Sequence, residues 1–314
     1  MTEDRTRAIS FNFPELRVGI AEYDAGPTGC TVLYLPDGAD CALDVRGGSP
    51  GVFGGGYGFT HAISFAGGSL YGLEAAMGIA SALLEQRGSV NWTSIDLVSG
   101  AIIWDFGVRE TIVYPDKALG KQALLAAETG SCPVGARGAG RSATVGKFGR
   151  DLVPPLTTES SGQGAAFAEI GERGAKVFIL TVVNAIGVVL DRDGTVVRGA
   201  VDPEGKRWHP RDAADALVEA SDRAVREGLP TQNTTITALI TNVKMSALAL
   251  DRLGKQVHTS MARAIRPFHA ANDGDVFFTL STGTVETDAI SDFSLTEIAS
   301  DLAWDAVLNA VNGE

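Results

Sequence analysis

The apolar positions of this chain fall into short β-prone runs and longer runs with helical spacing, separated by glycine, proline and other turn residues. Helical spacing predicts helices at residues 69–87, 116–127, 212–227, 246–264 and 295–311. The β-prone runs predict strands at residues 17–23, 31–35, 42–45, 95–106, 176–184, 195–198, 234–242 and 276–280. Because paired strands are set between long helices without strict alternation, we expect strands that form their own layers with helices outside. The pattern predicts an α/β fold in which residues 1–314 form a single domain.

The stretch at residues 231–242, TQNTTITALITN, combines a polar start with a strand that opens on Thr234. If the peptide bond between Asn233 and Thr234 were cut, Thr234 would carry a free α-amine beside its hydroxyl. This pairing is a nucleophile with its own base attached. The alternative is that Thr234 simply starts a strand, where threonine is common.

A threonine nucleophile needs groups that accept a proton and groups that stabilise an oxyanion. Lys147, in the glycine-rich segment 135–149, is one candidate, although many lysines lie on the surface. Asn184 ends an apolar strand, so its amide can face an oxyanion or bond its own turn. Asp273 and Asp275, in the sequence DGD, can hold an amine between two carboxylates or can form an ordinary turn.

Composition and charge narrow the classes of function. The formal net charge is −12, with no basic cluster, which argues against nucleic acid or an anionic membrane as partner. Three cysteines and four histidines show no close ligand spacing, so neither a metal nor another cofactor is predicted. No nucleophile elbow of the G-x-S-x-G type occurs, and the glycine-dense residues 47–58 favour a close-packed loop over a phosphate cradle. The N-terminus has no apolar core for a secretory signal, so we expect a cytoplasmic protein.

The motifs of this chain resemble those of the nylon-oligomer hydrolases, the 6-aminohexanoate-oligomer endo-hydrolases of the wider DmpA-like family of self-cleaving aminopeptidases and amidases. The resemblance runs in order over nearly the whole chain, through FNFP, YGLEAA, IIWDF, VYPDKALG, GAGRSATVGK, NTTITALITNV, IRPFH, DGD and WDAVL. It implies a four-layer α/β/β/α sandwich of the N-terminal-nucleophile type. It also implies cleavage between Asn233 and Thr234 into fragments 1–233 and 234–314, and a homotetramer of processed protomers.

The resemblance also assigns roles to residues. It makes Thr234 the nucleophile, with Lys147, Asp273 and Asp275 as further catalytic residues and Asn184 as a group for the oxyanion or for positioning. Trp104 stands where these hydrolases carry a tyrosine close to the catalytic lysine. An indole is bulkier than a phenol and offers only an N–H donor, so Trp104 is a substrate-pocket candidate that can alter the surroundings of Lys147.

The function implied by the resemblance is a self-processing amide hydrolase that acts on linear aliphatic amide oligomers such as those of 6-aminohexanoate. An aminopeptidase or β-peptidyl aminopeptidase acting on small peptides is the alternative within the family, although that branch typically cleaves itself at Gly–Ser. The alternative from another class is a non-catalytic, unprocessed assembly protein that keeps the scaffold.

Overall fold

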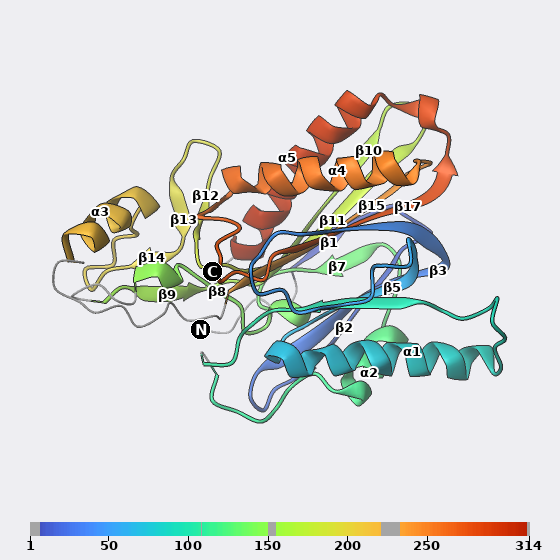
Figure 1. Ribbon diagram of the computed structural model, residues 1–314, viewed down its shortest axis with the longest axis horizontal. Coiled ribbons are helices and arrows are strands. Elements are labelled where there is room, and N and C mark those ends of the chain that lie inside the picture. Colours follow the sequence, from blue (N-terminus) through green and yellow to red (C-terminus); the bar gives the residue numbers. More distant parts are fainter. Residues whose placement is uncertain (1–6, 108, 150–154, 221–232, 313–314) are drawn as a thin grey trace.

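The computed structural model describes residues 7–107, 109–149, 155–220 and 233–312, and its centre is one folded sheet (Figure 1). Within these residues, nine strands share continuous hydrogen bonding. Their order is β10 (Gln163–Ile170), β11 (Ala175–Asn184), β15 (Thr234–Val243), β17 (Val276–Val285), β3 (Thr28–Val45), β5 (Phe59–Ala66), β6 (Val98–Ile102) and β4 (Val52–Phe53), with β2 (Arg17–Tyr23) also paired to β3. The pairs are antiparallel except β15 with β17 and β5 with β6.

Strand β3 joins the two halves of this sheet. Its first part pairs with β2 and β5, and its last part pairs with β17. The register against β5 shifts between Tyr34 and Ala39, and Gly38 in this interval has a φ of 74°. The sequence predicted two separate strands at 31–35 and 42–45, whereas the structure has one irregular strand of 18 residues. This long strand lets one half of the sheet lie over the other.

Side-chain alternation along β11 shows how the layers form. Phe178, Leu180 and Val182 point into the core between the two halves of the sheet, where Leu33 and Phe65 also lie. The residues between them, including Val177, Ile179 and Val183, pack into a second core beneath the C-terminal helices. A strand that buries both faces is apolar at nearly every position, which is the pattern that the sequence shows here.

Helices cover the two outer faces of the folded sheet. Helices α4 (Ala247–Ser260) and α5 (Asp292–Val311) lie over β10, β11, β15 and β17, while α1 (Glu74–Arg87) and α2 (Lys117–Leu125) lie over β2, β3 and β5 (Figure 1). Side-chain caps start three of them: Asp116, Ser246 and Ser291 each accept an N–H from three residues further on. The predicted four-layer α/β/β/α arrangement is confirmed.

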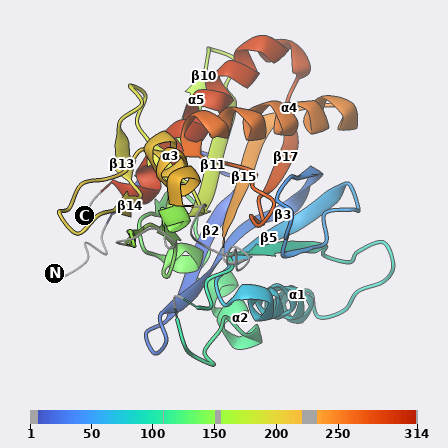
Figure 2. The same cartoon turned by 60° about the vertical axis from the view of Figure 1, so that its left-hand side comes forward.

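Smaller elements complete the chain. They are the pair β1 (Ala8–Ser10) and β7 (Ser131–Pro133), the sheet of β12 (Val188–Leu190), β13 (Val196–Arg198) and β16 (Ile265–Arg266), the sheet of β8 (Thr144–Val145), β9 (Thr157–Ser160) and β14 (Ala200–Val201), the helix α3 (Pro210–Ala220), and the 3-10 helices η1 (Ser69–Leu73), η2 (Gly138–Gly140), η3 (Lys147–Gly149), η4 (Met261–Arg263) and η5 (Thr287–Ala289). Figure 2 brings α3 and its neighbours β13 and β14 forward, beside the main sandwich.

Several predicted boundaries differ from those in the structure. The predicted strand at 95–106 is wrong in length, because β6 ends at Ile102 and the chain then leaves the sheet. The predicted helix at 212–227 is present as α3 up to Ala220, and its remainder lies outside the described residues. No helix in the described part of the chain is both long and apolar enough to cross a membrane.

Candidate active site

Thr234 is the first residue of β15 and is fully buried. Because side chains alternate along a strand, Thr234 shares its face with Ile236, Ala238 and Ile240, which line the core between the two halves of the sheet. Its neighbour across the antiparallel ladder is Asn184, the last residue of β11. The strand therefore places the hydroxyl of Thr234 at the end of the inter-sheet core.

The peptide bond between Asn233 and Thr234 lies among hydrogen-bond donors. The Thr234 hydroxyl donates to the carbonyl oxygen of Asn233, and the peptide N–H of Gly274 donates to the same oxygen over 3.0 Å. The peptide N–H of Trp104 in turn donates to Thr234 Oγ1 over 3.3 Å. A hydroxyl thus lies beside a carbonyl whose oxygen accepts a backbone N–H, the kind of donor that stabilises an oxyanion.

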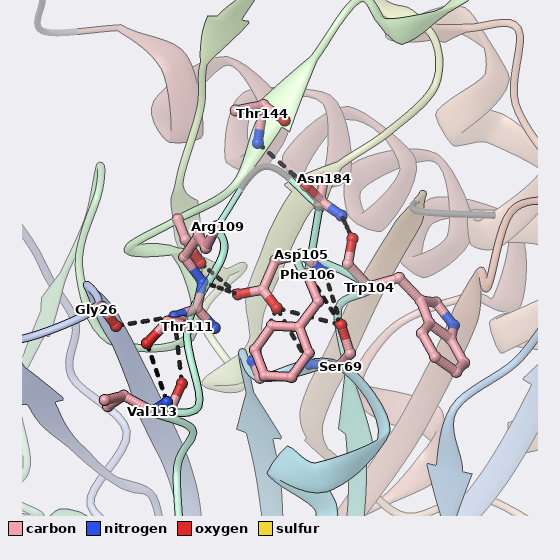
Figure 3. A network of polar contacts seen from close by, with 12 residues as sticks. Gly26, Ser69, Trp104, Asp105, Phe106, Arg109, Thr111, Val113, Thr144 and Asn184 are labelled. Carbon is pink, nitrogen blue, oxygen red and sulfur yellow. Dashed lines mark hydrogen bonds and ion pairs between the residues drawn. The ribbon is translucent and has the colours of Figure 1, made fainter. Parts of the chain in front are cut away.

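Lys147 and Asn184 form a buried polar group beside Thr234. The ammonium of Lys147 donates to the backbone oxygen and to Oδ1 of Asn184, each over 2.8 Å. Oδ1 also accepts the peptide N–H of Thr144, and Nδ2 donates to the backbone oxygen of Trp104 over 2.8 Å (Figure 3). Lys147 is 6% exposed, so the alternative of an ordinary surface lysine is wrong.

Asp273 and Asp275 are buried at the turn before β17. Asp275 accepts the peptide N–H of Thr235 at Oδ1 over 2.7 Å, and the peptide N–H and ring Nδ1 of His269 at Oδ2. Asp273 accepts the peptide N–H of Ala270 at Oδ2, while its Oδ1 has no hydrogen-bond partner within the described residues.

The pKa of Asp273 is raised to about 7. Burial is the main cause, and the negative charge of Asp275 adds to it, whereas the nearby amides of Ala270 and Ile186 and the ammonium of Lys147 lower the pKa. A carboxyl group whose pKa lies near 7 can exchange a proton near neutral pH, and Asp273 is such a group.

The segment 46–49 holds the turn that contains both aspartates. The peptide N–H groups of Arg46 and Gly47 donate to the backbone oxygen of Asp275, and that of Ser49 donates to the backbone oxygen of Asp273. A Cβ on Gly47 would lie 2.2 Å from the amide nitrogen of Asp275. Only glycine allows this approach, which confirms the close-packed loop expected at the start of residues 47–58.

Trp104 contacts the site through its backbone N–H and its backbone oxygen. Its peptide N–H and backbone oxygen hydrogen-bond Thr234 and Asn184, whereas its indole N–H donates to the backbone oxygen of Ser49 over 2.9 Å. The sequence drew attention to the indole and to its effect on Lys147. A contact made by backbone atoms cannot be predicted from the type of side chain. This applies to the N–H of Trp104 and equally to the N–H of Gly274.

A pair of histidines lies behind Asp275. His269 contacts Asp275, and its ring meets that of His258 edge to face, with the centroids 4.4 Å apart. His258 Nδ1 is 2.9 Å from Oδ2 of Asp44. Burial lowers the pKa of His258, with a contribution from the neighbouring His269, while Asp44 and Asp275 raise it. Within the described ranges, no group of three or more His, Cys, Asp or Glu side chains is placed to hold a metal ion.

Comparison with solved structures identifies the class of fold. The chain aligns with the L-aminopeptidase D-Ala-esterase/amidase from Ochrobactrum anthropi, described as a new variant among the Ntn hydrolase fold, with a TM-score of 0.67 and 16% sequence identity. The alignment covers 94% of this chain and 83% of that one. The architecture is that of an N-terminal-nucleophile hydrolase, as the resemblance implied.

Comparison of sequences identifies the family. The profile of Peptidase family S58 matches residues 12–313, and the chain belongs to this family of amide-bond hydrolases. A 6-aminohexanoate-oligomer endohydrolase of Paenarthrobacter ureafaciens is 44% identical over 315 residues, covering 96% of this chain and 85% of that protein. A putative NylC-analogous protein of Agromyces sp. (strain KY5R) is also 44% identical, over 96% of this chain and 99% of its own length. The resemblance to nylon-oligomer hydrolases is confirmed.

Proposed function

We propose that this chain is an amide hydrolase that cleaves itself between Asn233 and Thr234 and then uses Thr234 as its nucleophile. The observation that carries the proposal is the hydroxyl of Thr234 beside the Asn233 carbonyl, whose oxygen accepts the Gly274 N–H. Membership of Peptidase family S58 and the N-terminal-nucleophile fold support it.

Self-cleavage begins when Thr234 Oγ1 attacks the carbonyl carbon of Asn233 and its proton passes to a base. The carbonyl oxygen becomes an oxyanion that the Gly274 N–H stabilises. The C–N bond then breaks as the nitrogen of Thr234 takes up a proton, which leaves an ester between Asn233 and Thr234. Water hydrolyses the ester, so that Asn233 ends in a carboxylate and Thr234 carries both its hydroxyl and a free α-amine.

Asp273 suits the proton transfers of this first reaction. The nitrogen of Thr234 is part of an amide until the bond breaks, so it cannot act as the base. Asp273 pairs with Asn233 in a parallel β-bridge, and its pKa of about 7 allows it to accept a proton and return it near neutral pH. Lys147 lies close enough to lower this pKa, and it keeps Asn184 in place.

In the processed enzyme, Thr234 attacks the carbonyl of a substrate amide, and its α-amine accepts the hydroxyl proton. Asn184, opposite Thr234 in the sheet, supports the oxyanion through its amide or through the groups that it positions. Asp275, bonded to the peptide N–H of Thr235, lies next to the new amine and balances its charge when it is protonated. The acyl-enzyme is then hydrolysed.

For the substrate, we propose linear aliphatic amide oligomers such as those of 6-aminohexanoate. The support is the 44% identity to an endohydrolase named for these oligomers. Trp104 is partly exposed and remains the substrate-pocket candidate. Cleavage of an oligomer with a blocked amine would indicate the endohydrolase, whereas turnover restricted to peptides with a free amine would indicate an aminopeptidase.

We also propose a homotetramer of processed protomers in the cytoplasm. Light scattering would test the oligomeric state, and cell fractionation would test the localisation.

Intact mass measurement tests self-cleavage directly. The wild type should give two fragments, the second beginning at Thr234, and Thr234→Ala should give one chain without amidase activity. Thr235→Val is the matched control, because Oγ1 of Thr235 is buried without a hydrogen-bond partner in the described structure and its peptide N–H to Asp275 is retained. A wild type that stays intact would support the unprocessed assembly protein instead. Cleavage in Thr234→Ala would exclude Thr234 as the nucleophile.

A further inference from the structure

Ser69 and Asp105 bind each other's backbone in a reciprocal arrangement, which we call the Ser69–Asp105 clamp (Figure 3). The hydroxyl oxygen of Ser69 accepts the peptide N–H groups of Asp105 and Phe106, over 3.1 and 3.0 Å. In return, Oδ1 of Asp105 accepts the peptide N–H groups of Gly68 and Ser69, over 2.9 and 3.1 Å. Four backbone donors from two segments are satisfied by two side chains.

The other oxygen of the Asp105 carboxylate ties the clamp to further segments. Oδ2 accepts the guanidinium Nε of Arg109 over 3.1 Å and the hydroxyl of Ser142. Arg109 also donates to the backbone oxygens of Gly26 and Val113 (Figure 3). Asp105 is fully buried, and a buried carboxylate persists only where donors of this number compensate for its lost hydration.

Ser69 has an unfavourable backbone conformation. Its φ is 51°, in the left-handed region, although it carries a Cβ. Such a conformation persists where the surrounding contacts over-determine it, and these positions gather at active sites. Here the contacts that hold it are those with Asp105 and Phe106.

The clamp acts on the peptide group that reaches the nucleophile. The peptide between Trp104 and Asp105 has two ends: its N–H donates to Ser69 Oγ, and its oxygen accepts Nδ2 of Asn184. The preceding N–H, that of Trp104, donates to Thr234 Oγ1. Rotation of this peptide would therefore release Asn184, and a displacement of the Trp104 backbone would also move the N–H that donates to Thr234 Oγ1.

We propose that Ser69 and Asp105 are positioning residues for both reactions of this enzyme, because they fix the backbone on either side of Trp104 against Thr234 and Asn184. The proposal rests on the proposed function. Neither residue touches the reacting atoms. A clamp that loses its hydroxyl leaves the N–H groups of Asp105 and Phe106 without their acceptor. The backbone next to Trp104 then gains freedom where it contacts Asn184 and Thr234.

The test compares Ser69→Gly with Glu22→Gln. The glycine removes the hydroxyl and the steric conflict together, so an effect on rate is not an effect of added strain. Glu22 is the matched control, since its carboxylate also accepts a backbone N–H, from Gly138, and two arginine side chains. These partners all lie in the segment 137–141 and not in the segment 104–106. Precursor from cell-free synthesis gives the rate constant of fragment formation. Turnover of a short 6-aminohexanoate oligomer gives kcat and KM, and thermal melting gives stability.

For Ser69→Gly we expect self-cleavage and kcat to fall about tenfold or more, because small displacements of reacting groups cost rate steeply, while KM stays within about twofold. Asp105→Asn should act in the same direction. Glu22→Gln should keep both rates within about twofold. Wild-type rates in folded Ser69→Gly would overturn the proposal. So would a loss of rate in both Ser69→Gly and Glu22→Gln that is in proportion to the fall in their melting temperatures. A wild type that never yields the Thr234 fragment would overturn the proposed function itself, which is a different result.

Discussion

Replacing Asp273 by asparagine should stabilise the fold in a manner that depends on pH. The structure buries this carboxyl beside Asp275, and these two causes raise its pKa from 3.8 to about 7. Asparagine has nearly the same shape but cannot ionise. The comparison is made in a Thr234→Ala background, so that self-cleavage does not change the molecule that unfolds.

The magnitude follows from the difference in proton binding between the two states. Below about pH 4 the carboxyl is protonated both folded and unfolded, so the two proteins differ little in their response to pH. From about pH 4 to pH 7 the unfolded chain ionises while the folded chain keeps its proton, and the aspartate protein loses about 1.4 kcal/mol per pH unit. About three pH units make this loss about 4 kcal/mol above pH 7, where it is complete.

Urea denaturation followed by tryptophan fluorescence, at about pH 4, 6 and 8, measures this difference. The free energy of unfolding of Asp273→Asn, relative to the aspartate protein, should rise with pH to a plateau of about 4 kcal/mol. Taking the difference between two chains cancels the titrating groups that do not interact with Asp273. A difference that is the same at all three pH values, or that favours the aspartate protein at the highest, would refute the assignment of Asp273 as the proton-bearing carboxyl.

Three further substitutions have defined outcomes. Lys147→Met removes both hydrogen bonds to Asn184 and should slow self-cleavage at least about 100-fold, measured as a gel time course. An unchanged rate would show that the ammonium is dispensable. Trp104→Phe should keep self-cleavage within about twofold, because the peptide group makes the contacts to the site, while the lost indole hydrogen bond costs about 1 kcal/mol in urea denaturation. Gly47→Ala places a Cβ 2.2 Å from the amide of Asp275, so we expect about 3 kcal/mol of lost stability, and an unaltered urea midpoint would contradict this packing.

The sequence predicted the elements whose local pattern matches their surroundings. Residues 177–183 are apolar except for Thr181, and β11 is covered on both sides. Strand β10 was missed because its small and polar residues, QGAAFAEI, have weak β propensity. A Cβ on Gly164 in this strand would lie 2.0 Å from the backbone oxygen of Ala306 in α5. Glycine is therefore required at this position by the packing of a helix that is distant in sequence. No local window contains that information.

The candidate site divides in a similar way. Thr234 and Asn184 are side chains at the ends of strands, where residue type and position together suggested their chemistry. The donors of Gly274 and Trp104 are backbone groups, which every residue except proline possesses. The role of these two N–H groups depends only on the direction in which they point. That direction is fixed when the turn that contains Gly274 and the segment after β6 fold against β15.

The place of β15 in the sheet has a kinetic consequence. This strand lies between β11 and β17, and β17 continues the sheet into β3, so residues 234–314 contribute two inner strands. In the uncut chain a tether keeps these strands near their places at a high effective concentration. Once the chain is cut, denatured fragments must find each other by diffusion. Refolding of the processed protein should therefore be second order in protein and slow when dilute, whereas docking of β15 in the uncut Thr234→Ala chain stays first order. The proposed self-cleavage would thus leave a structure that folds as one chain and refolds more slowly from two fragments.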